Sequence, residues 1–212
     1  MGIVVIGTVF VDIKGFPEDV YIPNGRNAGR IEYVHGGVAR NVVEDIANLE
    51  LRPTFVGTVD STSMGKDVVE KLVRHKVNVD YVKAVPDGMG TWLALFNEDG
   101  DVAGQISKRP NTYLPMLILE KHGDEIVKDC DSIIFELDLH KDVVKKIFEL
   151  AEKYHKKVYA LVSNMSTPCH PQPTEYYYPH SPQYINHRHR SCAIHAYTGN
   201  HWSAAHALPH HH

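Results

Sequence analysis

The sequence predicts an α/β layered fold with a mostly parallel sheet over residues 1–165. Short apolar runs, typical of buried strands, alternate with longer segments whose apolar residues recur at helical spacing. The first run, Ile3–Ile6, ends at Gly7, and the last, 157–162, follows the amphipathic segment 141–155. Strands that alternate with helices usually pair in parallel, because each helix carries the chain back across the sheet.

The first half of this region predicts a strand, a flap and two helices with their following strands. The strand 3–6 precedes a segment, 13–35, of turn residues and short alternating pieces, which indicates a small exposed sheet or flap. Gly36-Gly37 then opens a helix whose apolar positions lie on one face: Val38, Val42, Val43, Ile46 and Leu49. The next expected elements are a strand at 53–57, a helix with Ser63 as its N-cap, and a strand at 81–85.

The second half begins with two strands, 91–96 and 102–106, which flank a polar loop and predict a hairpin. The elements expected after it are a broken helix at 117–128, a strand at 132–137 closed by Asp138, a helix at 141–155 and a strand at 157–162. Segments 13–35 and 88–107 interrupt the alternation of strands and helices. We therefore expect them to pair as a small β-lid over one end of the sheet.

The composition excludes several classes of protein. The 212 residues carry a formal net charge of −4. This mixed, near-neutral balance argues against partners such as nucleic acid or an anionic membrane. No apolar run approaches the roughly 20 residues that span a bilayer, and the start shows no basic leader. Three widely spaced cysteines, an odd number, favour a reducing cytoplasm over a disulfide framework.

The segment 166–212 differs from the rest of the chain. It holds 10 of the 15 histidines, no lysine and a single acid, Glu175. Because it has no hydrophobic period, we expect an irregular or disordered tail. Three explanations remain open: a His-rich metal-binding segment, a cloning remnant at the final histidines, and a shifted reading frame after about Met165, which we favour.

Polar residues and glycines follow the predicted strands at the positions where open α/β sheets bind ligands. Asp12 follows the first strand, Gly36-Gly37 precedes a helix with Asn41 in its first turn, and Asp138 closes the strand 132–137. Carboxylates accept hydrogen bonds from vicinal hydroxyls, an amide both donates and accepts, and paired glycines let a ligand approach the backbone. Together these residues predict a polyol site.

Each residue also has a purely structural alternative. Asp12 could cap a turn, the glycine pair could form a tight connection, Asp138 could cap the next helix, and Asn41 could be an exposed helix residue. Other motifs carry no chemistry: Gly65-Lys66-Asp67 lacks the spacing and the hydroxyl residue of a phosphate loop. The sequence contains no CxxC or HExxH zinc signature.

A longer stretch resembles a known family. Residues 34–82 read VHGGVARNVVEDIANLELRPTFVGTVDSTSMGKDVVEKLVRHKVNVDYV. This pattern resembles the N-terminal signature of the ribokinase-like, or PfkB, family of carbohydrate and nucleoside kinases, and Asp12 and 135–138 match it as well. Within the family, residues 27–33 and 36–41 look nearest to pseudouridine kinases.

The resemblance implies a ribokinase-like, Rossmann-type αβα sandwich with a β-lid, and transfer of a phosphoryl group from ATP, with Mg²⁺, to a hydroxyl of a sugar or ribonucleoside. It implies that Asp12, Gly36, Gly37 and Asn41 hold the sugar hydroxyls. It places Thr91 in the lid near the substrate and Asp138 on the substrate or phosphate path. It also makes a homodimer through the lid plausible.

The sequence departs from the family pattern at one decisive point. The family's Gly-Ala-Gly-Asp catalytic loop, whose aspartate is the general base, does not occur in this chain. Most of the ATP site is missing with it, so we expect a truncated kinase with little or no activity. The alternative is a non-catalytic sugar- or nucleoside-binding fragment whose His-rich tail captures metal.

Overall fold

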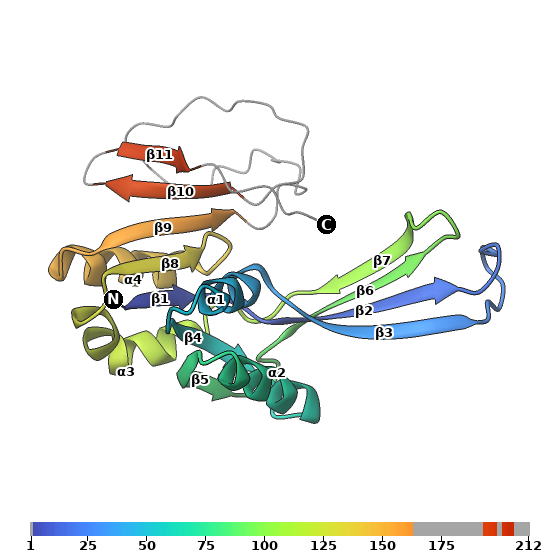
Figure 1. Ribbon diagram of the computed structural model, residues 1–212, viewed down its shortest axis with the longest axis horizontal. Helices are drawn as coiled ribbons and strands as arrows, with labels where there is room; N and C mark the ends of the chain where they lie inside the picture. Colours follow the sequence, from blue (N-terminus) through green and yellow to red (C-terminus); the bar gives the residue numbers. More distant parts are fainter. Residues whose placement is uncertain (1, 163–192, 199–200, 206–212) are drawn as a thin grey trace.

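The computed structural model describes residues 2–162, 193–198 and 201–205. Its main sheet has seven strands in the order β11-β10-β9-β8-β1-β4-β5 (Figure 1). The five strands β9, β8, β1, β4 and β5 are parallel, whereas β10 and β11 run antiparallel at one edge. The strand bounds in chain order are Ile3–Ile6 for β1, Thr54–Val59 for β4, Asn78–Ala84 for β5, Ser132–Glu136 for β8 and Lys157–Val162 for β9.

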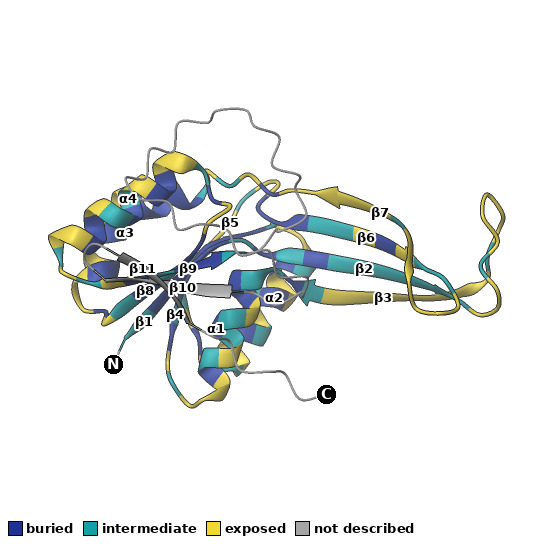
Figure 2. Cartoon of the chain, turned by 90° about the horizontal axis from the view of Figure 1, so that it is seen from above, coloured by how far each residue is buried: buried dark blue, intermediate teal, exposed yellow. Residues whose placement is uncertain are grey.

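Helices cover both faces of this sheet, as Figure 2 shows. Their bounds are Val38–Asn48 for α1, Ser63–Arg74 for α2, Pro115–Lys128 for α3 and Lys141–Lys153 for α4. Because side chains alternate along a strand, β1 contributes to a hydrophobic core on each face of the sheet. Val4 and Ile6 pack with α3 and α4, and Val5 packs with α1 and α2. The expected α/β layered fold is therefore confirmed.

Four further strands form a second sheet that projects from one end of the main sheet (Figure 1). Its order is β3-β2-β6-β7, with bounds Phe10–Pro17 for β2, Gly29–Gly36 for β3, Gly90–Phe96 for β6 and Val102–Lys108 for β7. Strands β2 and β6 pair in parallel, with Phe10 opposite Gly90. The segments 13–35 and 88–107 thus meet in one sheet, as expected from the sequence.

Some local predictions were wrong. The N-cap of α2 is Thr62, whose hydroxyl accepts from the Gly65 amide, and Ser63 is already helical. Helix α3 is continuous, because Pro115 lies in its first turn, where its missing N–H costs no hydrogen bond. The N-cap of α4 is His140, which replaces the structural alternative of Asp138 at that position.

The expectation of an irregular tail is corrected over two short ranges. Strands β10 (Ala193–Thr198) and β11 (His201–Ala205) extend the main sheet beyond β9, whose edge would otherwise leave backbone groups unpaired. The other predictions for residues 166–212, including metal binding, fall largely outside the described residues. Within the described residues, no helix has the length and apolar character to cross a bilayer.

Candidate functional site

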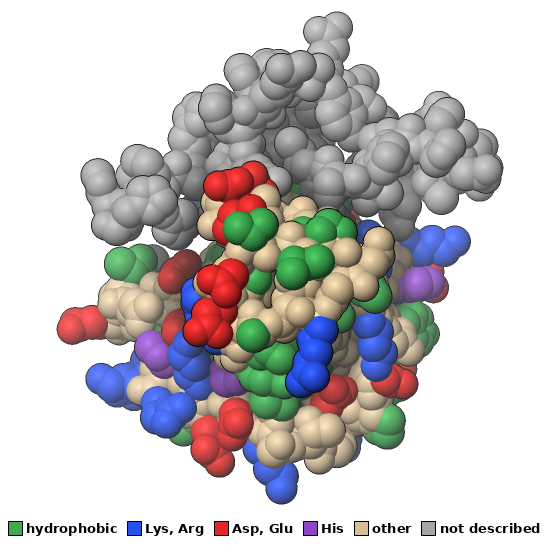
Figure 3. Space-filling view, turned by 90° about the vertical axis from the view of Figure 1, so that its right-hand side faces the viewer, with side chains coloured by type: hydrophobic (Ala, Val, Ile, Leu, Met, Phe, Trp, Pro, Cys, Tyr) green, Lys and Arg blue, Asp and Glu red, His purple; other side chains and the backbone are tan. Residues whose placement is uncertain are grey.

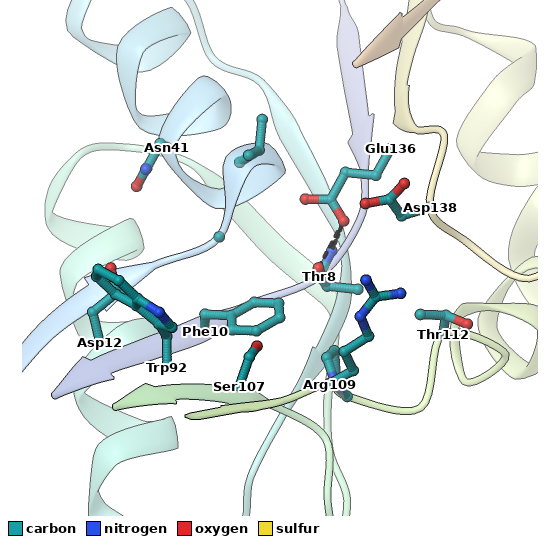
Figure 4. Close-up of a pocket in the computed structure, with 13 residues that line it drawn as sticks. Thr8, Phe10, Asp12, Asn41, Trp92, Ser107, Arg109, Thr112, Glu136 and Asp138 are labelled. Atoms are coloured by element: carbon teal, nitrogen blue, oxygen red, sulfur yellow. Dashed lines mark hydrogen bonds between the residues drawn. The ribbon is translucent and has the colours of Figure 1, made fainter. Parts of the chain in front are cut away.

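A pocket lies where the carboxyl ends of β1 and β8 meet the base of the second sheet, with a cavity volume of about 380 Å³. Figure 4 shows its side chains converging from both sheets and from the start of α1. Its polar lining comprises Thr8, Asp12, Asn41, Ser107, Arg109, Thr112, Glu136 and Asp138. Phe10 and Trp92 add aromatic surface. This is the position at which open α/β sheets bind ligands.

The structure brings most of the residues singled out from the sequence to this pocket. Asp12, Gly37, Asn41 and Asp138 line it. Gly36 lies beneath Asp12, since a Cβ placed on Gly36 would be 2.6 Å from Oδ1 of that carboxylate. The geometry therefore unites residues that lie far apart in the sequence, while their roles toward a ligand stay predictions.

Thr91 does not line the pocket. It pairs with Val11 of β2, whereas its neighbour Trp92 pairs with Asp12, and paired residues in a sheet point to the same face. Thr91 therefore points to the face of the second sheet opposite Asp12, and Trp92 is the β6 side chain at the pocket.

Gly37 shapes the start of α1. Its φ of 101° and ψ of 126° belong to a region that side chains disfavour, and a Cβ there would lie 2.6 Å from the Thr8 carbonyl oxygen. Glycine thus lets the helix begin directly against the end of β1. The first turn of α1 faces the pocket as a result.

Glu136 fastens this junction and is 2% exposed. Its Oε2 accepts from the Thr8 amide at 2.9 Å and the Thr8 hydroxyl at 2.7 Å, and its Oε1 accepts from the Ala39 amide at 2.8 Å (Figure 4). Burial raises the pKa of the Glu136 carboxyl, and these donors act in the opposite direction. One carboxylate therefore joins β8, β1 and the N-terminus of α1, where negative charge is favourable.

The charges of the pocket are mixed. Asp12 is half-buried, and burial raises the pKa of its carboxyl while nearby Lys14 lowers it. Arg109 follows β7 and points its guanidinium toward the side of the pocket that holds Thr8 and Asp138 (Figure 4). The arrangement offers acceptors for hydroxyl groups near α1 and β2, and a cation for an anionic group near Arg109.

The described residues do not supply a metal site on their own. No group of three or more His, Cys, Asp or Glu side chains in the described part of the chain is placed to hold an ion. Both carboxylate oxygens of Glu136 accept hydrogen bonds from backbone amides.

Sequence reasoning missed several pocket residues. Glu136 had a signal, because an acid inside the apolar run 132–137 needs a buried partner. Phe10, Trp92 and Arg109 had none, since their place depends on how β2, β6 and β7 are arranged around the pocket.

Comparisons with known proteins identify the family of the chain. Residues 2–173 match the model of the pfkB family carbohydrate kinases. The chain is 32% identical over 165 residues to a guanosine-inosine kinase of Exiguobacterium acetylicum, covering 77% of this chain and 54% of the relative. It is 22% identical over 151 residues to the pseudouridine kinase of Escherichia coli K12, covering 70% and 48%. The chain thus spans about half the length of these relatives.

Solved structures share the fold at low identity. A carbohydrate kinase from Agrobacterium tumefaciens matches with a TM-score of 0.66 and 17% identity, over 75% of this chain and 52% of that one. Arabidopsis thaliana ribokinase, complexed with ribose and ATP, matches with a TM-score of 0.62 and 20% identity, over 74% and 51%. The fold and the family match agree, and the chain belongs to the pfkB family of carbohydrate kinases.

Proposed function

We propose that this chain forms the acceptor-binding part of an ATP-dependent kinase and that the acceptor is a ribonucleoside. The observation that carries the proposal is the convergence of Asp12, Asn41, Asp138 and Arg109 in one pocket beneath the second sheet. The guanosine-inosine kinase relative supports a nucleoside, with higher identity than the pseudouridine kinase. The family match by itself also allows an acceptor that is a sugar without a base.

In this proposal the ribose hydroxyls bind between β2 and α1. Asp12 accepts hydrogen bonds from hydroxyl groups, Asn41 adds its amide, and Gly36-Gly37 lets the ligand approach the backbone. Trp92 and Phe10 provide apolar surface for a ring. Asp138 and Arg109 lie on the side where a phosphoryl group would arrive, and the second sheet closes as a lid that excludes water.

The donor half of the reaction is proposed to lie outside these residues. ATP and Mg²⁺ are implied by the family, and Mg²⁺ would neutralise charge on the transferred phosphoryl group. The sequence lacks the Gly-Ala-Gly-Asp loop expected to supply the general base. A cytoplasmic location is part of the proposal and is supported by the free, buried thiol of Cys130.

We expect the purified chain to bind inosine or guanosine without phosphorylating them. Isothermal titration should give saturable binding of these nucleosides, weakened about tenfold or more by Asp12→Ala. With ATP and Mg²⁺, a panel of inosine, guanosine, pseudouridine and ribose should give no phosphorylated product above a blank without protein. Robust turnover would contradict the proposed inactivity, and binding of none of the panel would contradict the acceptor site.

Inosine binding should depend on pH through Asp12. The ionised carboxylate accepts a hydrogen bond from a hydroxyl group and the protonated form does so poorly, so the affinity for inosine should be full above the pKa of Asp12 and fall below it. Because burial raises this pKa, the midpoint should lie above the ordinary value of 3.8. Titrations across acidic pH measure it, and Asp12→Asn should remove this transition. A midpoint at or below 3.8 would contradict the role of Asp12.

A homodimer through the second sheet is a further part of the proposal. The strand register puts Ile31, Tyr33, Leu93 and Ile106 on the face opposite Asp12 and Trp92. Ile31 is 65%, Tyr33 62% and Ile106 69% exposed. Figure 3, viewed from the projecting end of this sheet, shows hydrophobic side chains at the surface between charged ones. Such a face on a sheet favours association.

We expect light scattering after size exclusion to report a dimer that Ile106→Asp converts to a monomer, because the substitution places a charge in the apolar face. Ser107→Asp is the matched control, since Ser107 lies on the opposite, pocket-facing side of β7. A wild-type monomer at all concentrations, or equal loss of dimer in both variants, would count against this interface.

A further inference from the structure

Arg40 is a charged side chain that the fold buries beside the pocket. It lies in the first turns of α1 and is 4% exposed, whereas its neighbour Asn41 is exposed and lines the pocket. Nη1 of Arg40 donates to Oδ1 of Asn41 at 2.8 Å and to the carbonyl oxygen of His35 at 3.2 Å. One guanidinium thus connects the pocket amide to the end of β3.

The other side of the guanidinium is held in place by an ion-pair network. Nη2 of Arg40 pairs with Oε2 of Glu44, one helical turn further along α1. Glu44 Oε1 lies 3.2 Å from Nζ of Lys71 and 3.4 Å from Nε2 of His75, both presented by the C-terminal end of α2. Nδ1 of His75 lies 2.9 Å from Oδ1 of Asn48. Arg40 is therefore fixed by two helices rather than by one contact.

This contact determines which way round the Asn41 amide lies. A guanidinium has five donors and no acceptor, so the Asn41 atom facing it must be the carbonyl oxygen. Within the described residues, Nδ2 of Asn41 has no hydrogen-bond partner, so the NH2 is free to donate. Without Arg40, rotation of the amide by 180° would exchange donor and acceptor at little cost.

We propose that Arg40 is a positioning residue that holds Asn41 as a hydrogen-bond donor toward the bound ligand. The pocket then presents a donor from α1 and an acceptor from β2, where Asp12 stands. A hydroxyl group of the ligand near Asn41 is bound through its oxygen lone pair, and a group without a lone pair is rejected. This inference rests on the proposed acceptor site and names the polarity with which that site recognises a hydroxyl.

The first test separates donor from acceptor at Asn41. Asn41→Asp keeps an acceptor oxygen for Arg40 and replaces only the NH2 group. We expect the affinity of the full chain for inosine to fall by about 10- to 100-fold, because a donor is replaced by a charged acceptor, while the melting temperature stays the same or rises. Unchanged affinity in Asn41→Asp would overturn the proposal, because it would mean that Asn41 presents its oxygen to the ligand.

The second test asks whether Arg40 acts through Asn41. Arg40→Met keeps the apolar stem of the side chain and removes the guanidinium, whose Nε has no partner among the described atoms. Glu44 keeps its contacts with Lys71 and His75. We expect about five- to tenfold weaker inosine binding. In an Asn41→Ala background the same change should alter affinity by less than about twofold. Equal losses in both backgrounds would overturn the proposal.

Arg74→Met is the matched control, because Arg74 carries the same charge on nearby α2 and its side chain makes no salt bridge or hydrogen bond within the described residues. It should leave inosine affinity within about twofold. The side-chain NH2 of Asn41, assigned in ¹⁵N spectra by its disappearance in Asn41→Asp, provides a readout without ligand. Its resonances should move in Arg40→Met and not in Arg74→Met.

The two readouts also distinguish this inference from the proposed function. If the wild-type chain binds no inosine but the Asn41 resonances respond to Arg40→Met alone, the acceptor site fails and the contact between Arg40 and Asn41 stands. If inosine binds but the resonances ignore Arg40→Met, the positioning role of Arg40 is wrong.

Discussion

Replacing Glu136 by alanine is expected to lower the free energy of unfolding by about 3–5 kcal/mol, which makes it one of the most damaging single changes in the chain. The change removes the acceptor of three hydrogen bonds and leaves the partly buried amide of Thr8 and the buried amide of Ala39 without that partner. Urea denaturation followed by circular dichroism measures the loss. For a chain of this size the melting temperature should fall by about 6–20 °C.

Two milder variants act as controls for Glu136→Ala. Glu136→Gln keeps one acceptor oxygen and the shape of the side chain, so its loss should be smaller, about 1–3 kcal/mol. Thr8→Ala removes the hydroxyl donor at 2.7 Å but keeps the hydrogen bond from the backbone amide of residue 8. It should lower the free energy of unfolding by about 1 kcal/mol. If Glu136→Ala were no more destabilising than Thr8→Ala, the hydrogen bonds of the Glu136 carboxylate would not be what stabilises the contact between β8, the end of β1 and the start of α1.

The second large effect is expected at Gly36 and Gly37, where substitution of one glycine should mainly reduce stability and substitution of the other should mainly reduce binding. Gly37→Ala forces a side chain into a positive φ and toward the Thr8 carbonyl oxygen, which is backbone and cannot move aside. We expect a loss of about 2–4 kcal/mol in the free energy of unfolding. Thermal and urea denaturation measure it.

Gly36→Ala is the matched comparison. Its added methyl group would meet the carboxylate of Asp12, the movable end of a side chain, so the fold should tolerate it while Asp12 is displaced. Inosine affinity should then fall about tenfold or more with a smaller change in stability than Gly37→Ala causes. Equal losses of stability at both positions would contradict this division between folding and binding.

Much of the main sheet could be predicted because its signals are local. The runs at 3–6 and 157–162 are short and apolar, and the structure has strands there. The helix at 141–155 has a clear apolar face, and α4 ends two residues earlier, at Lys153. Helix and strand periods report burial on one face, which neighbouring residues along the chain already encode.

The pocket was predictable only in part, for a physical reason. Asp12, Gly37 and Asn41 lie close to strand ends or a helix start, where the sequence itself marks a ligand-binding position. The family resemblance implies that Thr91 lies near the substrate, but the register of β6 points Trp92, and not Thr91, into the pocket. A shift of one residue along a strand reverses the face, and no local pattern in 88–107 fixed that register.

Arg40 illustrates the same limit from the opposite direction. A charged residue in the first turns of a helix is normally solvent-exposed, yet this one is buried. Its burial depends on Glu44, and on Lys71 and His75 from α2, which only the packing of two helices brings together.

The central place of β1 has a consequence for how the chain is made. This strand is synthesised before every other strand of the described sheets, yet one of its two neighbours in the sheet is β8, and 128 residues separate Thr8 from Glu136. At a synthesis rate of about 5–20 residues per second, β1 waits about 6–26 seconds for that neighbour. During this time one edge of an apolar strand stays open to other nascent chains and to chaperones. Long-range pairing of this kind is slow. The strands in the middle of the sheet therefore control how much of the chain folds correctly during translation, as well as the stability of the folded protein.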